Sequence, residues 1–129
     1  MSTPLHHIGY VVDNIDFYSK HFPFLELYKS VFDPIQKAEI KLFKQNASQG
    51  IFYEFIKPTS NDSFTWKHLE KNGSGFHHLC YGPIEPKKLE QIVHAYKLLK
   101  IRGPIYANLF NREVSFYMTR TKSLIEFII

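Results

Sequence analysis

The sequence contains 129 residues, of which 44% are hydrophobic and 22% charged, and its formal net charge is +4. These values predict one globular domain over residues 1–129, and the scattered lysines and arginines argue against a nucleic-acid partner. No apolar run is long enough to span a membrane, and the first four residues lack the features of a signal peptide. A single cysteine excludes an internal disulfide framework, so we expect a cytoplasmic protein.

The first half of the chain, residues 1–58, is predicted to form a strand, a short helix and three more strands. Near-continuous apolar character indicates a buried first strand, and Ile15, Tyr18 and Phe22 then recur at helical spacing before Pro23. Strict alternation from residue 37 indicates a half-exposed strand. The expected strands cover residues 3–12, 24–31, 37–44 and 50–57, with turns at 33–34 and 46–50.

The second half, residues 75–129, repeats this order after a polar linker at 59–74 that is expected to hold a short helix at 64–71. Proline in the first turn opens a helix near residue 86. The apolar stripe of this helix is Leu89, Ile92, Val93, Tyr96 and Leu99. Three closing strands follow a turn at Gly103-Pro104. The four strands of this half are expected at residues 75–82, 105–109, 112–118 and 124–129.

A short internal repeat marks the two halves. Leu5-His6-His7-Ile8-Gly9-Tyr10 recurs 71 residues later as Phe76-His77-His78-Leu79-Cys80-Tyr81. Tyr53-Glu54-Phe55-Ile56 likewise recurs 72 residues later as Ile125-Glu126-Phe127-Ile128. Repeats of this size indicate two copies of one structural unit, related by an approximate two-fold axis.

The repeated histidines and glutamates predict a metal site. A glutamate inside an apolar strand is costly unless it is paired or bound to a metal, and both Glu54 and Glu126 lie in such runs. Two imidazoles and two carboxylates suit a divalent ion such as Zn, Ni, Co, Mn or Fe. Neighbouring residues of a regular strand point to opposite faces, so one histidine of each pair is expected to face the cleft. The sequence therefore predicts an α+β fold in which two tandem βαβββ modules form a curved mixed sheet around a metal-binding cleft.

These residues resemble the vicinal oxygen chelate superfamily, and most of all its methylmalonyl-CoA epimerases. The likeness covers essentially the whole chain and rests on four stretches: residues 5–12, 53–59, 69–79 and 124–126. The resemblance implies that the second histidine of each pair binds the metal. The metal ligands carried over are then His7, Glu54, His78 and Glu126, and His6 and His77 remain supporting residues.

The resemblance also implies a reaction, in which two substrate oxygens chelate the metal and a carboxylate removes the proton alpha to a carbonyl. Glu39 resembles a catalytic glutamate of some epimerases and is the expected base. Glu126 is the second expected acid/base, and Glu113, at the position equivalent to Glu39 in the second half, is a weaker candidate. The substrate is expected to be a small, anionic acyl thioester.

Two stretches depart from the pattern of the epimerases. Residues 106–111 and 118–123 lack the glycines and prolines usual in the loops that border the cleft, and the second loop is shortened. The metal site is therefore expected to be retained, whereas the choice of substrate is open.

Three alternatives to an epimerase remain at this stage. Glyoxalase I-like lactoylglutathione lyase activity would use a similar His-Glu-His-Glu set, and a metabolite- or drug-binding resistance protein would use the cleft without turnover. A ring-cleaving dioxygenase would need further catalytic histidines and tyrosines that the sequence does not place. The resemblance to this family, together with an exposed edge strand, predicts a homodimer. No membrane partner is expected.

Overall fold

The computed structural model describes residues 3–45 and 50–129 of the chain. Eight strands and three helices occur in these residues. In chain order they are β1 (Leu5–Val11), α1 (Ile15–Ser19), β2 (Leu25–Asp33), β3 (Ala38–Gln45), β4 (Phe52–Pro58), α2 (Trp66–Asn72), β5 (Gly75–Tyr81), α3 (Pro86–Tyr96), β6 (Leu99–Ala107), β7 (Arg112–Met118) and β8 (Leu124–Ile128). This order confirms the two βαβββ units.

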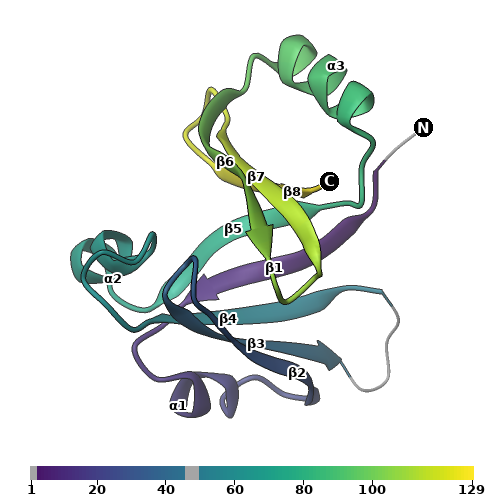
Figure 1. The fold of residues 1–129 in the computed structure, drawn as a ribbon. Helices are drawn as coiled ribbons and strands as arrows, with labels where there is room; N and C mark the ends of the chain where they lie inside the picture. The colour runs from purple at the N-terminus through teal and green to yellow at the C-terminus, as the bar shows by residue number, and fades with distance from the viewer. Residues whose placement is uncertain (1–2, 46–49) are drawn as a thin grey trace.

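The strands form one curled, mixed sheet in the order β2-β3-β4-β1-β5-β8-β7-β6 (Figure 1). In each unit the first strand pairs in parallel with the last, β1 with β4 and β5 with β8. The two units join where β1 pairs antiparallel with β5. The first strands of both units therefore lie at the centre of the sheet, and the second strands, β2 and β6, lie at its edges. The predicted α+β class and curved sheet are confirmed.

Apolar side chains cover both faces of the sheet. On the outer face, α1 packs over Val12 and Phe55, while α3 packs through Leu89 over Tyr117 and Phe127. The inner face carries one core cluster in each half. The first-half cluster consists of Val11, Ala38, Ile40, Leu42, Ile56 and Leu109, and the second-half cluster of Cys80, Ala107, Val114, Phe116 and Ile128. The centre of the inner face, between these clusters, is where the repeated histidines and glutamates lie.

The structure differs from the predicted elements at the end of α3 and the start of β6. Tyr96 lies in the last turn of α3 but is 69% exposed, so it does not belong to the buried stripe. Leu99 is not on the buried stripe of α3, because the helix ends at Tyr96 and Lys97 takes a left-handed conformation. Strand β6 therefore begins at Leu99 and runs through Gly103-Pro104, where its pairing with β7 shifts register, instead of beginning after a turn. The hairpin turn predicted at 46–50 lies, apart from Gly50, outside the described residues.

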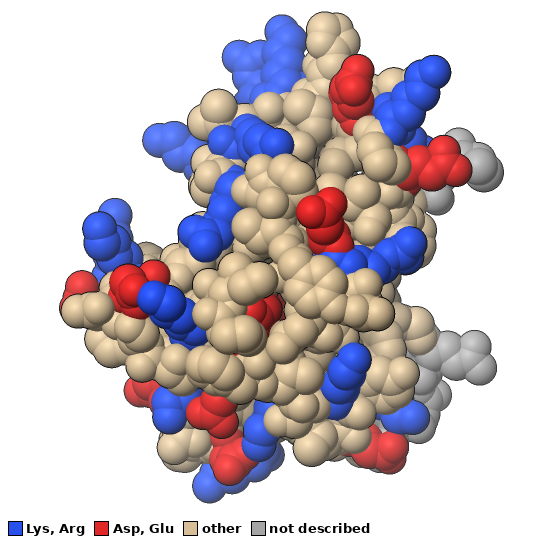
Figure 2. All heavy atoms as spheres, viewed as in Figure 1, with Lys and Arg blue, Asp and Glu red and all other residues tan. Residues whose placement is uncertain are grey.

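Charged side chains are spread over the surface. Figure 2 shows Lys and Arg on several parts of the visible face, with Asp and Glu between them, as the sequence predicted. Among residues 3–45 and 50–129, no helix has the length and apolarity needed to cross a membrane.

Candidate metal centre

Four side chains from four adjacent central strands meet on the inner face. They are His7 on β1, Glu54 on β4, His78 on β5 and Glu126 on β8. The two histidine Nε2 atoms lie 3.1 Å apart. The Oε1 atom of Glu54 lies 3.2 Å and 3.3 Å from these nitrogens, and Oε1 of Glu126 lies 3.1 Å and 3.0 Å from them. The structure thus brings together the four residues named from the sequence, which we call the His/Glu cluster.

The chemistry of the His/Glu cluster fits a divalent ion. Both histidines are 0% exposed and both glutamates 3% exposed, and within the described residues Oε1 of each glutamate accepts no well-aligned hydrogen bond. The two imidazole nitrogens lie close to each Oε1, and a cation bound among the four donor atoms would offset the remaining cost of burying the carboxylates. Ligand atoms around Zn²⁺ at bond lengths of about 2.0–2.2 Å are separated by about 3.0–3.5 Å, depending on coordination number, which matches the observed separations. The nitrogen and oxygen donors are those of transition-metal sites.

Without a metal, the cluster is held together by charge. Burial alone would raise the pKa of Glu54 and of Glu126, but the adjacent His7 and His78 lower both below the usual range. Burial likewise opposes protonation of the histidines, and the two carboxylates override it, so that the pKa of His7 is raised well above its usual value and that of His78 is also raised. A metal must therefore displace protons from these imidazoles in order to bind.

The small residue of each repeat makes room for the cluster. Gly9 lies between Glu54 and His78 in the strand register, and Cys80 lies between His7 and Glu126 in the same way. A Cβ atom on Gly9 would lie 2.2 Å from the His78 ring, which is too close for any side chain. The pattern of the repeat, a small residue two positions after the second histidine, therefore has a packing reason that sequence reasoning did not identify.

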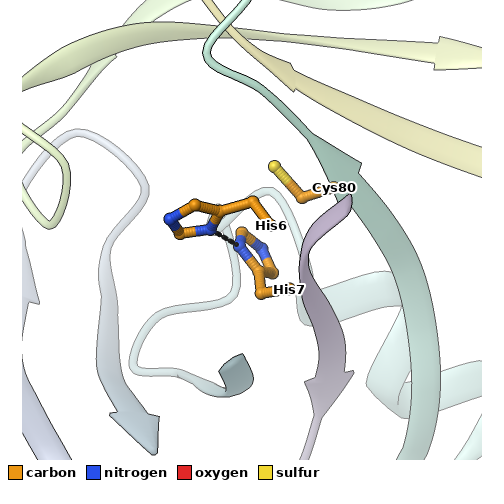
Figure 3. Close-up of side chains that lie close together, drawn as sticks. All are labelled: His6, His7 and Cys80. Atoms are coloured by element: carbon orange, nitrogen blue, oxygen red, sulfur yellow. Dashed lines mark hydrogen bonds between the residues drawn. The ribbon is translucent and has the colours of Figure 1, made fainter. Parts of the chain in front are cut away.

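Regular strand alternation predicts that His6 and His77 point away from the cleft, but in the structure both point toward it. Each is the extra residue of a β-bulge: His6 where β1 shifts against β5, and His77 where β5 shifts against β1. A bulge re-aims a side chain. His6 Nδ1 consequently lies 2.9 Å from His7 Nδ1 (Figure 3), and His77 Nδ1 lies 2.8 Å from His78 Nδ1.

These two contacts orient the imidazoles of the cluster. Burial, followed by the charge of His7, lowers the pKa of His6 to about 4, and burial with the charge of His78 lowers the pKa of His77 to about 2. Both are therefore neutral near pH 7, and their Nδ1 atoms can accept the Nδ1–H of His7 and His78. A histidine that donates from Nδ1 presents the lone pair of Nε2, the atom at the cluster.

Glu39 and Glu113, the other acid/base candidates, lie on the opposite face of the sheet. On β3 the residues that face inward are Ala38, Ile40 and Leu42, and the exposed Glu39 instead borders an outer hollow beside Asp16 and Lys41. Glu113 alternates with the inward-facing Val114 and is exposed as well. The assignment of Glu39 as the base is therefore corrected, because its carboxylate cannot reach the cluster across the sheet.

Cys80 lies close to His6 and His7 and forms a second group of possible ligand atoms (Figure 3). Its side chain is 0% exposed and packs with Ala107 and Val114. Burial, with the nearby carboxylate of Glu126, raises the pKa of the thiol, so the sulfur stays protonated. A thiol is a poor metal ligand compared with a thiolate, and we assign Cys80 a packing role.

Comparisons with known proteins identify this fold. No protein-family model and no curated protein matches the sequence. Among solved structures, a hypothetical protein from Bacillus halodurans C-125 has a TM-score of 0.82 at 24% identity, covering 99% of this chain and 94% of that chain. Methylmalonyl-CoA epimerase from Mycobacterium tuberculosis has a TM-score of 0.81 at 18% identity, covering 99% and 91%.

A single-residue variant of Streptomyces coelicolor methylmalonyl-CoA epimerase, in complex with 2-nitronate-propionyl-CoA, has a TM-score of 0.79 at 19% identity and covers 99% of this chain and 97% of that chain. The resemblance to the vicinal oxygen chelate superfamily, with methylmalonyl-CoA epimerases as structural neighbours, is thereby confirmed for the fold. At these identities the likeness is one of fold.

The first prediction concerns Gly9. Replacing it with alanine should displace the His78 ring and weaken Zn²⁺ or Co²⁺ binding by at least about tenfold, as measured by titration calorimetry. Gly75→Ala is the matched control, because a Cβ there meets nothing within 4 Å. Equal affinities of the two variants would contradict the packing role of Gly9.

The second prediction concerns the bulge histidines. His6→Ala and His77→Ala should each weaken metal affinity by about 10–100-fold, because the cluster imidazoles lose the acceptor that orients them. His77→Asn keeps an oxygen acceptor near the position of Nδ1 and should recover part of the affinity. The exposed His94 supplies the control His94→Ala, which should bind as the wild type does. If all three alanine variants bind alike, the orienting role is wrong.

The third prediction concerns pH. Because the pKa values of His7 and His78 are raised in the metal-free protein, metal binding should release protons, and affinity should fall as the pH falls. We expect about one or two protons per ion near pH 6. Titration calorimetry in two buffers of different ionisation enthalpy measures this number. Release of no protons on metal binding would show that both imidazoles are already neutral in the metal-free protein.

Proposed function

We propose that this protein is a metal-dependent epimerase or isomerase that moves the proton alpha to the carbonyl of a small acyl thioester, as methylmalonyl-CoA epimerases do. The observation that carries the proposal is the His/Glu cluster, in which two buried carboxylates and two imidazoles meet at the centre of an epimerase-like sheet. The fold by itself would not justify a reaction, since one fold can host many chemistries.

The proposed ligands are His7, Glu54, His78 and Glu126. Two neutral imidazoles and two carboxylates would balance the charge of a divalent ion, which removes the repulsion between the buried anions. When bound, such an ion supplies Lewis acidity for the negative charge that develops on the substrate carbonyl oxygen. The protein contributes preorganisation, because the strands, the bulge histidines and Gly9 fix the donor atoms in place.

Glu126 and Glu54 are the proposed acid/base pair. Within the described residues, they are the carboxylates that reach the inner face at the cluster. Both carboxylates are ionised before the reaction, because their pKa values are lowered. The two come from opposite halves of the sheet. One of them, released from the metal, would accept the alpha proton, and the other, after taking up a proton from solvent, would return it from the opposite side.

The substrate and assembly are also part of the proposal. Acyl-CoA binding by epimerases with this fold, and the aliphatic inner face of the first half, support an acyl thioester. A homodimer is supported by the exposed apolar side chains of the edge strands, such as Leu27 and Tyr28 on β2 and Leu99 on β6. Analytical ultracentrifugation gives the oligomeric state.

The fourth prediction tests the reaction. Metal-loaded protein in D₂O should exchange the alpha proton of methylmalonyl-CoA, as followed by NMR. Glu126→Gln should slow exchange by about 10²–10⁴-fold, because the amide cannot accept the proton. Glu39→Gln and Glu113→Gln are the controls and should keep the wild-type rate, since both carboxylates lie on the outer face.

Absence of exchange in metal-loaded wild-type protein would contradict the epimerase proposal. The same sample should then be assayed with the hemithioacetal of methylglyoxal and glutathione, the substrate of a glyoxalase I-like lyase. Normal exchange in Glu126→Gln would instead reject the role given to that residue.

A further inference from the structure

The His/Glu cluster is covered by a turn of the chain's own second half. Residues 108–111, between β6 and β7, cross the inner face. Leu109 is 3% exposed and packs with Val11, Ile40 and Leu42, on strands of the first half. The Phe110 ring stacks on the His7 ring at 5.4 Å and meets the His6 ring edge-on at 5.1 Å. Leu109 and Phe110 therefore occupy space directly beside the cluster, where a substrate could bind if they moved.

The turn is held by two hydrogen bonds to the edge strand β2. Lys29 Nζ donates to the Leu109 carbonyl oxygen at 2.7 Å, and Asn108 Nδ2 donates to the Phe32 carbonyl oxygen at 3.0 Å. Strand β2 forms its ladder with β3, and none of its ladder residues pairs with the turn. Opening of the turn would therefore break these two bonds and withdraw Leu109 and Phe110 from their packing, but it would break no strand pairing with β2.

The space filled by Leu109 has a defined chemistry. Its walls are the aliphatic side chains of Val11, Ala38, Ile40, Leu42 and Ile56. All of them are at most 3% exposed, and none carries charge. An aliphatic chain can replace Leu109 there, whereas a carboxylate or phosphate would lose its hydration without gaining a partner.

We propose that residues 108–111 form a gate over the cluster, and that Leu109 fills the subsite that receives the aliphatic part of the substrate's acyl group when the gate opens. The second part of this inference rests on the proposed function, because it takes the ligand to be an acyl thioester. The gate itself rests on the contacts of the turn and is independent of any reaction.

Cys80 provides a direct probe of gate opening. It is the one cysteine of the sequence, is fully buried, and packs in the second-half core cluster against which Phe110 also packs. Its rate of reaction with 5,5′-dithiobis(2-nitrobenzoate) under native conditions reports opening of this region. The double variant Lys29→Met/Asn108→Ala should react about tenfold faster than the wild type, because it lacks both bonds to β2.

Lys44→Met is the matched control for labelling. Lys44 is on β3, next to the edge strand, where it lies near Glu26 and over the Tyr28 ring. In the Lys44→Met variant, Cys80 should react at a rate within about twofold of the wild-type rate. Urea unfolding of each variant separates local from global opening. The gate proposal is wrong if Cys80 of the double variant reacts at the wild-type rate. It is also wrong if the loss of folding stability fully accounts for a faster reaction.

The subsite is tested with propionyl-CoA and free CoA on metal-loaded protein by titration calorimetry. Leu109→Ala should raise the affinity for propionyl-CoA relative to CoA by about fivefold, because no leucine has to be displaced. Phe17, which is exposed on α1, supplies the control Phe17→Ala, which should leave the ratio unchanged. An unchanged ratio in Leu109→Ala, or no binding of propionyl-CoA by any variant, overturns the acyl subsite. Neither measurement uses proton exchange, so their failure is distinct from failure of the proposed reaction.

Discussion

The cost of burying two carboxylates at the centre of a sheet is the constraint on which the rest of the structure depends. Glu54 and Glu126 face each other across β1 and β5, and within the described residues each leaves an oxygen without a well-aligned hydrogen bond. Two imidazoles within 3.3 Å offset part of this cost, and a cation would offset more. The central strands, bulges and small residues all serve to bring these four groups to one point.

The local geometry explains why the repeat has its particular pattern of residue types. A histidine pair on a regular strand would send one ring to each face, but the bulges at His6 and His77 turn both rings of each pair inward. One ring then supplies a donor atom and its neighbour holds it in place. The small residue two positions later prevents a clash with the ring from the other half. Each position of the repeat therefore carries a separate physical task.

Much of the fold and the cluster could be predicted from the sequence, because a repeat doubles the signal. The matched glutamates in apolar runs identified the cluster, and hydrophobic patterning gave the βαβββ order. Bulges leave no mark in periodicity, so the inward position of His6 and His77 was missed. Alternation alone could also have placed Glu39 outward, since Ala38, Ile40 and Leu42 are the apolar partners on β3. The resemblance to epimerases instead implies a catalytic role for Glu39. Gly103-Pro104 is typical of a turn, so the sequence does not indicate that β6 begins at Leu99 and runs through these residues.

The turn over the cluster has a counterpart in the first half that behaves differently. The equivalent turn, residues 34–37 between β2 and β3, leaves Ile35 48% exposed at the surface. Either half supplies one histidine and one glutamate, so two identical halves would suffice to assemble the donor set. If the halves were identical, the two equivalent turns would both pack over the cleft or would both lie away from it. Joining the halves in one chain allows them to diverge, so that the turn of the second half packs on the cluster while its counterpart in the first half keeps Ile35 at the surface.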